Sequence, residues 1–343
     1  MVLAGAGSGK TRVLTTRVAH LILEHGVPAH RVLAVTFTNK AAGEMRDRIG
    51  TILGRDPRGM WIGTFHALGA RLLRRHAPLL GWTNAFTIFD AEQSLRQVKR
   101  TLEGLQIDTK KWNPKAVRSQ MSGAKNQLLD PEDFAREHEG GFDLFLRQVA
   151  KAYPAYQAAL RDQNAFDFDD LLVKPVRLFE SHPEVLAQYR DRFSFLLVDE
   201  YQDTNRAQFR FLELLAQDHG NLMVVGDDDQ SIYGWRGADI RNILEFEATF
   251  PGARVVRLEQ NYRSTAVILD AANAVIAQNT QRKVKTLRTD RVGGESLTRV
   301  ECFDERDEAG CIVDEIQTRY EGGPDLHNYR DFAILSRTNA QSR

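Results

Sequence analysis

The 343-residue chain is poor in cysteine, has no long apolar run and carries no excess of either charge. Cys302 and Cys311 are its only cysteines, and neither a CxxC spacing nor a group of histidines accompanies them. A zinc site or a disulfide framework is therefore unsupported, and two reduced, packed cysteines are expected. No apolar run approaches the roughly 18 residues of a membrane helix, and no basic leader with an apolar segment opens the chain. We therefore expect a cytoplasmic protein without a membrane segment.

Charged residues are balanced in number, 46 basic against 46 acidic, but they are unevenly distributed. Residues 67–130 hold eleven lysines and arginines against five acids. Either a basic surface patch or a set of ordinary solvated helix faces fits this surplus. The eleven basic residues are Arg71, Arg74, Arg75, Arg96, Lys99, Arg100, Lys110, Lys111, Lys115, Arg118 and Lys125.

Short apolar segments bounded by polar residues recur along the chain and predict β-strands. They lie at residues 2–4, 32–37, 60–64, 195–198, 222–225 and 255–258. Helical patterns follow several of them, as at 11–23 and 39–53, and this alternation predicts a parallel sheet covered by helices. Between 67 and 191 long helical patterns such as 91–105 and 142–160 replace the alternation. We therefore expect an α/β domain with a mainly helical insertion.

A second unit is predicted after residue 258. Its pattern indicates helices at 265–279 and 305–320 and strands at 298–303 and 331–336. Only part of a typical α/β domain is built there, and the chain starts a few residues before its glycine-rich loop. We expect both ends to be truncated.

The segment Ala4-Gly5-Ala6-Gly7-Ser8-Gly9-Lys10-Thr11 matches the phosphate-binding loop, with Ala4 in place of its first glycine. Glycines let the backbone amides turn toward phosphates, Lys10 can neutralise the β and γ oxygens, and Thr11 can ligate Mg²⁺. The segment follows a predicted strand and opens a predicted helix, which is the context that the motif requires. A glycine-rich turn without function is the weaker interpretation.

An apolar predicted strand ends in Asp199 and Glu200. There Asp199 can hold Mg²⁺ and Glu200 can act as a general base. Alone, such a pair is often a solvated turn, but downstream of a phosphate loop it favours nucleotide hydrolysis. A GTPase is disfavoured because the nearest match to its guanine-reading sequence, NKAA, lacks the aspartate. A calcium loop on the DDD sequence is disfavoured because Ile232 stands where glycine is needed.

Residues 226–238, GDDDQSIYGWRGA, put acidic and amide groups close to Tyr233, Trp235 and Arg236. The first groups suit a nucleotide site, and the others suit stacking on bases. An ordinary buried turn with a surface arginine is the alternative. The segment could join ATP chemistry to a nucleic-acid strand.

Eight segments in order resemble superfamily 1A DNA helicases of the UvrD, PcrA and Rep type. They are AGAGSGKT at 4–11, AVTFTNKAAGEM at 34–45, GTFHA at 63–67, FDFDDLL at 166–172, VDEYQDTN at 198–205, GDDDQSIYGWRGA at 226–238, LEQNYRS at 258–264 and AILSRTNAQSR at 333–343. The resemblance implies a RecA-like P-loop parallel sheet, domain 1A, at 1–66 and 192–258. It implies a helical insertion, 1B, at 67–191 and a partial second RecA-like lobe, 2A, at 259–343.

The resemblance also implies a site for ATP and Mg²⁺. In it Gln230 senses the γ-phosphate, Arg263 acts on it as an arginine finger, and Tyr262 and Arg12 sandwich the adenine. The implied catalytic residues are Lys10, Glu200, Gln230 and Arg263, the metal ligands are Thr11 and Asp199, and the ATP-binding residues are Gly5, Ala6, Gly7, Ser8, Gly9, Lys10, Thr11, Arg12, Tyr262 and Arg263.

On the DNA side the resemblance implies aromatic stacking, which contributes about 1–3 kcal/mol per base and tolerates any sequence. The implied stacking residues are Phe37, Tyr233 and Trp235, and the other implied contacts are Thr38, Asn39, Thr64, His66 and Arg236. A purely structural role is the alternative for His66.

The implied function is an ATP-dependent 3′ to 5′ helicase or translocase on single-stranded DNA and single-strand/duplex junctions, in repair or replication. The chain departs from the family pattern at both ends. We expect the chain to lack the glutamine-containing segment that reads adenine, before the loop, and the 2B insertion and later motifs, after residue 343. The alternative is therefore a truncated ATP- and DNA-binding module without efficient hydrolysis or unwinding.

Overall fold

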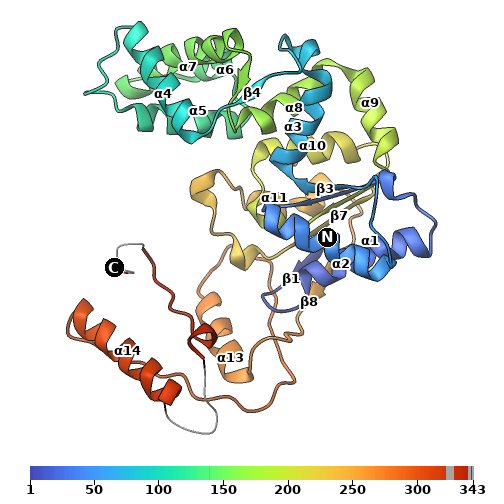
Figure 1. Cartoon of the computed structure of the whole chain (residues 1–343), viewed down its shortest axis with the longest axis vertical. Helices are drawn as coiled ribbons and strands as arrows, with labels where there is room; N and C mark the ends of the chain where they lie inside the picture. The colour runs from blue at the N-terminus through green and yellow to red at the C-terminus, as the bar shows by residue number, and fades with distance from the viewer. Residues whose placement is uncertain (139, 322–327, 339–340, 342–343) are drawn as a thin grey trace. The chain divides into compact units, whose positions relative to one another are not determined.

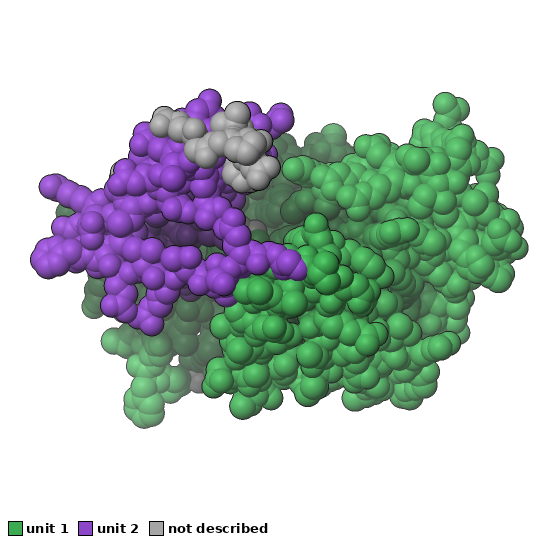
Figure 2. All heavy atoms as spheres, turned by 90° about the horizontal axis from the view of Figure 1, so that it is seen from below, with its two compact units in different colours: residues 1–292 green, residues 293–343 purple. Residues whose placement is uncertain are grey.

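A computed structural model describes residues 1–138, 140–321, 328–338 and 341, without the side chains of residues 236 and 321. The chain divides into two compact units, Met1–Val292 and Gly293–Arg343 (Figure 2). The first unit contains a large β-sheet and a helical insertion (Figure 1). Among the described residues no helix is long and apolar enough to cross a membrane.

Six parallel strands form the main sheet, in the order β3-β2-β6-β7-β1-β8. They are β1 (Val2–Ala4), β2 (Val32–Thr36), β3 (Trp61–Thr64), β6 (Phe195–Val198), β7 (Leu222–Gly226) and β8 (Val256–Leu258). The six predicted strands are confirmed to within one residue at each end. Because all strands run in the same direction, their carboxyl ends meet at one edge of the sheet.

Alternate strand residues face opposite layers of helices. On one face Ala34 of β2 and Leu197 of β6 belong to a core with buried residues of α1 (Lys10–Leu23) and α2 (Asn39–Leu53). On the other face Val35 and Val198 pack in a core with α3 (Phe65–His76) and α10 (Arg206–Ala216). Burial on both faces explains why these strands read as continuous apolar runs. The expected α/β fold with a parallel sheet is confirmed.

The insertion has its own apolar core, with Leu102, Val117, Met121 and Tyr156 fully or almost fully buried. A short parallel pair, β4 (Thr87–Ile88) with β5 (Ala165–Phe166), accompanies its helices. The remaining helices of the first unit are α4 (Ala91–Gly104), α5 (Pro114–Asn126), α6 (Pro131–His138), α7 (Leu144–Asp162), α8 (Asp170–Ser181), α9 (Pro183–Arg192), α11 (Arg241–Leu244), α12 (Phe246–Thr249) and α13 (Ala266–Ile276). The prediction of long helices in this insertion is confirmed.

The second unit contains α14 (Glu305–Glu321), as predicted, but the two strands predicted there are wrong. Residues 298–303 and 331–336 form no strand, and Phe303 and Leu335 are each 95% exposed. A strand needs a neighbour to pair its backbone groups, and none lies beside these segments in the described part of this unit. Cys302 and Cys311 are free and only half-buried here. The domain boundaries at 66/67, 191/192 and 258/259 stay predictions.

Candidate nucleotide site and nucleic-acid cleft

The carboxyl edge of the sheet collects most of the predicted site residues. The phosphate loop follows β1, Phe37 follows β2, Asp199 follows β6, and Asp227 follows β7. Strand β8 continues into Asn261, Tyr262 and Arg263, which lie beside the phosphate loop. The parallel sheet therefore gathers residues that are far apart in the sequence.

The phosphate loop is shaped by its glycines. Gly7 and Gly9 have φ angles of 72° and 91°, in the left-handed region that favours glycine. Ser8 closes the turn, because its amide and its hydroxyl both donate to the carbonyl oxygen of Gly5, at 3.2 and 2.7 Å. Helix α1 begins at Lys10 without a side-chain cap on its first amides. Such uncapped amides at a helix N-terminus suit a phosphate group.

Asn261 attaches the segment after β8 to this loop. Its side-chain amide donates to the carbonyl oxygen of Ala6 at 2.6 Å, and the amide of Tyr262 donates to the carbonyl of Gly7 at 3.0 Å. A Cβ on Gly7 would come within 2.8 Å of the Cβ of Arg263, so this close approach requires glycine. Asn261 lies in the family-like segment 258–264, but nothing in the sequence indicates this role, because its partner Ala6 is 255 residues away.

Tyr262 and Arg12 are both exposed close to the loop, and Tyr262 is 70% exposed. The Asn261 side-chain oxygen accepts hydrogen bonds from the amides of Arg263 and Ser264, at 2.8 and 2.7 Å. Asn261 therefore fixes the backbone from which the Arg263 side chain projects.

The predicted metal-holding and catalytic carboxylates lie against the phosphate loop. Thr11 Oγ1 donates to Asp199 Oδ2 at 3.1 Å, which brings two hard oxygen ligands together. Lys10 Nζ lies 3.7 Å from Glu200 Oε2. Glu200 has a φ of 52°, a left-handed conformation that is uncommon outside glycine and is enriched at functional sites.

Gln202, which sequence reasoning left without a role, connects the ends of β6 and β7. Its side-chain amide donates to Glu200 Oε2 at 2.8 Å, and its side-chain oxygen accepts from the Asp227 amide at 3.0 Å. Gln202 is 1% exposed, so its bond with Asp227 is shielded from water, whereas the Glu200 side chain at the other bond is 34% exposed. Gln202 thus holds the proposed general base in register with the next strand.

Burial and like charge raise the pKa values of two carboxyls in this site. Burial, and then the neighbouring Glu200, raise the pKa of Asp199 above its usual value. The same two causes raise the pKa of Asp203 to about 7. A raised carboxyl pKa marks a place where an additional positive charge would be stabilising, which fits a site for Mg²⁺.

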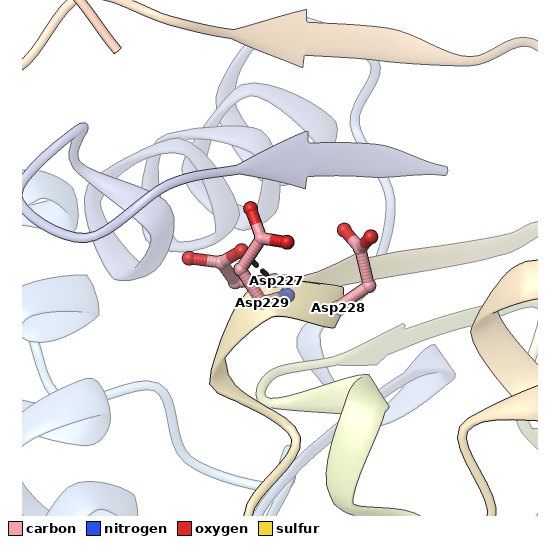
Figure 3. A group of neighbouring side chains, drawn as sticks. All are labelled: Asp227, Asp228 and Asp229. Carbon is pink, nitrogen blue, oxygen red and sulfur yellow. Dashed lines mark hydrogen bonds between the residues drawn. The ribbon is translucent and has the colours of Figure 1, made fainter. Parts of the chain in front are cut away.

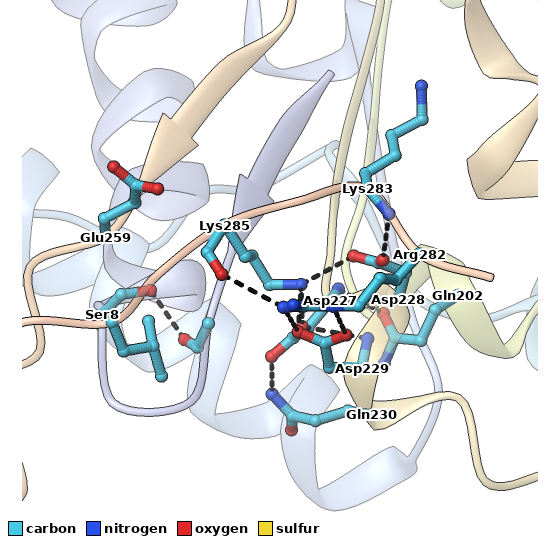
Figure 4. Close-up of polar contacts among 12 residues, drawn as sticks. Ser8, Gln202, Asp227, Asp228, Asp229, Gln230, Glu259, Arg282, Lys283 and Lys285 are labelled. Carbon is cyan, nitrogen blue, oxygen red and sulfur yellow. Dashed lines mark hydrogen bonds and ion pairs between the residues drawn. The ribbon is translucent and has the colours of Figure 1, made fainter. Parts of the chain in front are cut away.

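Three consecutive carboxylates follow β7, at Asp227, Asp228 and Asp229, and their oxygens lie within 4.8 Å of one another (Figure 3). Gln230 lies next to them, and its side-chain amide donates to Asp227 Oδ2. Figure 4 shows that cations from residues 282–285 reach the same carboxylates. Gln230, the predicted γ-phosphate sensor, is thus hydrogen-bonded to an acidic cluster whose carboxylates are paired with Arg282 and Lys285.

A cleft of about 800 Å³ lies where the ends of β2 and β3 meet the helical insertion. Five of the eight predicted DNA contacts line it: Phe37, Asn39, Thr64, His66 and Trp235. The insertion supplies residues of α4 and α5 to the opposite wall, among them Arg118 and Ser122. The cleft therefore combines aromatic, polar and basic side chains with four aspartates, Asp90, Asp167, Asp169 and Asp203.

The predicted stacking residues form a short row of rings. Phe37 and Tyr233 are stacked, with ring centroids 5.3 Å apart and planes at 28°. Tyr233 and Trp235 follow at 6.2 Å, and Trp235 is 75% exposed. Flat aromatic surfaces of this kind can receive unstacked bases. The side chain of Arg236, the remaining partner predicted in this segment, lies outside the described residues.

His66 lies against Phe168, a residue that sequence reasoning quoted but did not assign. The two rings stack with centroids 4.0 Å apart, and Phe168 is 56% exposed. Burial lowers the pKa of His66 to about 4, so the imidazole is neutral at physiological pH. A neutral ring can stack and form hydrogen bonds but supplies no charge to a phosphate.

Two predicted DNA contacts also begin helices. Thr38 accepts a hydrogen bond from the Ala41 amide at 3.1 Å and caps α2, and Thr64 accepts from the Ala67 amide at 3.2 Å and caps α3. Their hydroxyls therefore have structural roles in the unliganded chain. The segments that lead from β2 into α2 and from β3 into α3 are therefore fixed where the helices begin.

Lys125 is buried, so it belongs neither to a basic surface patch nor to a solvated helix face. It is one of the eleven basic residues of 67–130, but its side chain is 1% exposed. Its Nζ lies 2.6 Å from Asp167 Oδ2 and 2.9 Å from Asp170 Oδ1. Lys125 thus holds α5 against α8 and adds no charge to the surface. The partners follow it by 42 and 45 residues, so local spacing could not show the pair.

The parallel sheet, the glycine loop and the paired carboxylates at its edge define a P-loop nucleotide-binding protein. Comparison with known families is more specific. Residues 1–251 match the UvrD/REP helicase N-terminal domain, and residues 256–343 match the UvrD-like helicase C-terminal domain. The chain belongs to the UvrD/REP helicase family.

Similar proteins are described as ATP-dependent DNA helicase PcrA. The protein from Leuconostoc citreum is 49% identical over 344 residues, which cover 100% of this chain and 45% of that protein. Those from Staphylococcus aureus strain Mu50 and Staphylococcus epidermidis are 48% and 47% identical, each covering 100% of this chain and 46% of the relative. The chain spans about half the length of these relatives.

Proposed function

We propose that the chain belongs to an ATP-driven motor that moves 3′ to 5′ on single-stranded DNA and separates strands at single-strand/duplex junctions. The observation that carries this proposal is the neighbourhood of the two candidate sites. Strands β2 and β6 are adjacent, and they lead to Phe37 and Asp199 respectively. The segment after β6 contributes Glu200 to one site and Asn205 to the lining of the other. A change at one site can therefore reach the other through a few residues.

In the nucleotide site, the phosphate-loop amides and Lys10 bind the phosphates of ATP, and Glu200 accepts a proton from the attacking water. Gln230 and Arg263 contact the γ-phosphate, while Tyr262 and Arg12 flank the adenine. The positions of Lys10 opposite Glu200 and of Arg263 beside Gly7 support these roles.

Thr11 and Asp199 would hold Mg²⁺, and the juxtaposition of their oxygens at 3.1 Å fits this ion. When bound, Mg²⁺ neutralises developing charge on the phosphate oxygens. The raised pKa of Asp199 is consistent with a carboxylate that lacks enough positive charge around it.

In the cleft, the rings of Phe37, Tyr233 and Trp235 stack on successive bases, and Thr38, Asn39, Thr64, His66 and Arg236 contact the strand. ATP binding draws Gln230 and Arg263 toward the γ-phosphate. Because Gln230 and Trp235 lie on one short segment, this movement can displace a base from its stacking surface. We further propose a cytoplasmic role in DNA repair or replication.

A binding module that holds ATP and DNA without efficient turnover is the second candidate. The exposed Phe303 and Leu335 favour it, because apolar side chains that stay 95% exposed are not packed in a core that could hold further catalytic groups in place. Under this candidate the two sites bind their ligands, but hydrolysis and movement are absent.

Displacement of streptavidin from biotinylated single strands tests the proposal. A 3′ to 5′ motor needs ATP to displace streptavidin from the 5′ end and leaves it at the 3′ end, and Glu200→Gln abolishes displacement. Equal displacement at both ends would contradict the direction. Binding of ATP and DNA without displacement or ATP hydrolysis would favour the binding module.

A further inference from the structure

The acidic cluster after β7 encloses a buried lysine. Lys285 Nζ lies 2.8 Å from Asp227 Oδ1, 2.7 Å from Asp228 Oδ1 and 2.7 Å from Asp229 Oδ2. Its side chain is 1% exposed. An ammonium group has three N–H donors and no acceptor, so the three carboxylates match its hydrogen-bonding capacity. The cluster is therefore a pocket for the Lys285 side chain, in which the ammonium group lies where the three carboxylates could otherwise hold a metal ion.

Arg282 closes the pocket from the same segment. Its Nε donates to Asp229 Oδ1 at 2.8 Å and its terminal nitrogen donates to Asp229 Oδ2 at 2.7 Å, a bidentate pair. The Lys283 amide donates to Asp228 Oδ2 at 2.7 Å. Residues 282–285 are thus attached to the end of β7 by both side chains and backbone (Figure 4).

Asp227 connects Lys285 to two of the four proposed catalytic residues, Gln230 and Glu200. One of its carboxylate oxygens contacts Lys285, and the other accepts from the Gln230 side-chain amide. Its backbone amide donates to Gln202, which in turn donates to Glu200. A displacement of Asp227 would therefore disturb Gln230 directly and Glu200 through one intermediate residue.

The same segment continues to the loop that carries Arg263. The Thr286 amide donates to Glu259 Oε1 at 3.0 Å, and the carbonyl of Arg288 accepts from the Asn261 amide at 2.7 Å. Asn261 fixes the backbone of Arg263, as described above. One stretch of chain, 282–288, thus spans the supports of Gln230 and of Arg263.

We propose that Lys285 is a positioning residue for ATP hydrolysis: it fixes Asp227, which orients the Gln230 amide toward the γ-phosphate. This inference rests on the proposed ATPase function. Without Lys285, the three carboxylates would repel one another, with Arg282 the one basic side chain among the described residues left to pair with them, and Asp227 would lose its anchor. Gln230 would then sample orientations away from the phosphate, which lowers turnover more than binding.

The charge of Lys285 is constant over the physiological range. Burial by itself would lower its pKa, but the surrounding carboxylates, Asp227 foremost, outweigh burial and raise it above the usual value. Burial alone would raise the pKa of Asp229, yet the hydrogen bonds from Arg282 and Lys285 lower it. The pocket is therefore a permanent anchor and not a pH switch.

The test compares Lys285→Met with Lys283→Met in this chain. Both variants remove an ammonium group from the same segment, but within the described part of the chain the Lys283 side chain pairs with the half-exposed Glu247 alone, and its backbone bond to Asp228 survives. For Lys285→Met we expect kcat to fall about 10- to 100-fold, the range typical of supports of catalytic groups, with KM changed less than about threefold. Lys283→Met keeps the wild-type kcat.

A double-variant comparison separates positioning from general damage. If Lys285 acts through Gln230, adding Lys285→Met to Gln230→Ala produces little further loss of kcat. Losses that multiply would overturn the proposal, as would a folded Lys285→Met variant with wild-type kcat. The affinity of each variant for single-stranded DNA, measured without nucleotide, shows whether the variant is folded. If Lys285→Met does not fold, Lys285→Gln, which keeps N–H donors, replaces it and should show a smaller loss of kcat.

Hydrogen exchange without nucleotide distinguishes failure of this inference from failure of the proposed function. If the wild-type chain does not hydrolyse ATP, the motor function fails, but amides at 226–233 should still exchange faster in Lys285→Met than in wild type. Lys283→Met should match wild type. Unchanged exchange at 226–233 in folded Lys285→Met would overturn the positioning role whether or not the chain is an ATPase.

Discussion

At the ends of β1, β6 and β7 the candidate nucleotide-binding residues contact one another through hydrogen bonds and ion pairs. Near the ends of β2 and β3, in contrast, the candidate DNA-binding residues contact one another as stacked rings. Thr11 with Asp199 and Lys10 with Glu200 represent the first arrangement. Phe37 with Tyr233 and His66 with Phe168 represent the second. The first arrangement is typical of sites that hold a ligand of fixed charge, and the second is typical of surfaces on which any base can stack.

This difference suggests how one sheet edge could bind a nucleotide and DNA through separate residues and still link the two sites through shared segments. A charged group in the nucleotide site should affect turnover with little effect on strand affinity. An aromatic ring in the cleft should have the opposite effect. Under the proposed function, shared segments such as the one from Glu200 to Asn205 would provide the coupling.

The largest expected effect is on turnover in Glu200→Gln. The amide keeps the shape of the side chain but cannot accept the proton of the attacking water, so kcat should fall about 10²- to 10⁴-fold. Steady-state ATP hydrolysis measures the loss, and single-stranded DNA affinity should stay within about twofold of wild type, since the rings proposed to stack on bases are untouched. Glu44→Gln, on the half-exposed end of an α2 ion pair, is the matched control. A Glu200→Gln variant with near wild-type turnover would remove the proposed base.

The second effect is on strand affinity in Trp235→Ala. Loss of one stacking surface should weaken single-stranded DNA binding by about 1–3 kcal/mol, or roughly 5- to 150-fold in Kd. Fluorescence anisotropy with a labelled strand measures it, and ATP hydrolysis without DNA should be unchanged. Phe142→Ala removes a fully exposed ring outside the cleft and should leave Kd unchanged. Equal losses in both variants would show that the cleft has no special part in binding.

A third effect concerns the contribution of His66 to the pH dependence of the free energy of unfolding. Its pKa is about 4 in the folded chain and about 6.5 when unfolded, so only the unfolded state takes up a proton as pH falls from 7 to 5. This contribution stabilises the fold fully above pH 6.5 and is lost as pH falls toward 4, by about 2 kcal/mol between pH 7 and 5.

Urea unfolding of wild type and His66→Gln at both pH values isolates this contribution. The subtraction is needed because Asp169 and Asp203, with pKa values raised by burial to about 6 and about 7, favour the fold as pH falls. Parallel pH profiles in the two proteins would mean that His66 is accessible to protons in the folded chain.

The smallest effect is on the α2 cap. Thr38→Ala removes the hydroxyl that accepts from the Ala41 amide and should lower the free energy of unfolding by about 1 kcal/mol, while Thr38→Ser should restore it. Thr51→Ala, later in the same helix, removes a hydroxyl that donates to the Asp47 carbonyl and is the control. If Thr38→Ser restores stability but not strand affinity, the Thr38 methyl group and not its hydroxyl contacts DNA.

The sequence allowed prediction of the sheet and the phosphate loop because their signals are local. Each strand is a continuous apolar segment, and the glycine loop lies between a strand and a helix. Contacts across the fold could not be predicted in this way. The pairs of Lys285 with Asp228 and of Lys125 with Asp167 span 57 and 42 residues, and no periodicity indicates them. The two false strands show the same limit, because an apolar segment does not reveal whether a neighbouring strand exists.

The measurement that tests the central claim most directly is the rate of ATP hydrolysis with and without single-stranded DNA. If the two sites are coupled through the sheet edge, saturating DNA raises kcat in wild type, and Trp235→Ala needs a higher DNA concentration to reach the same stimulation. A hydrolysis rate that does not change when DNA is fully bound would contradict the coupling and leave two independent sites.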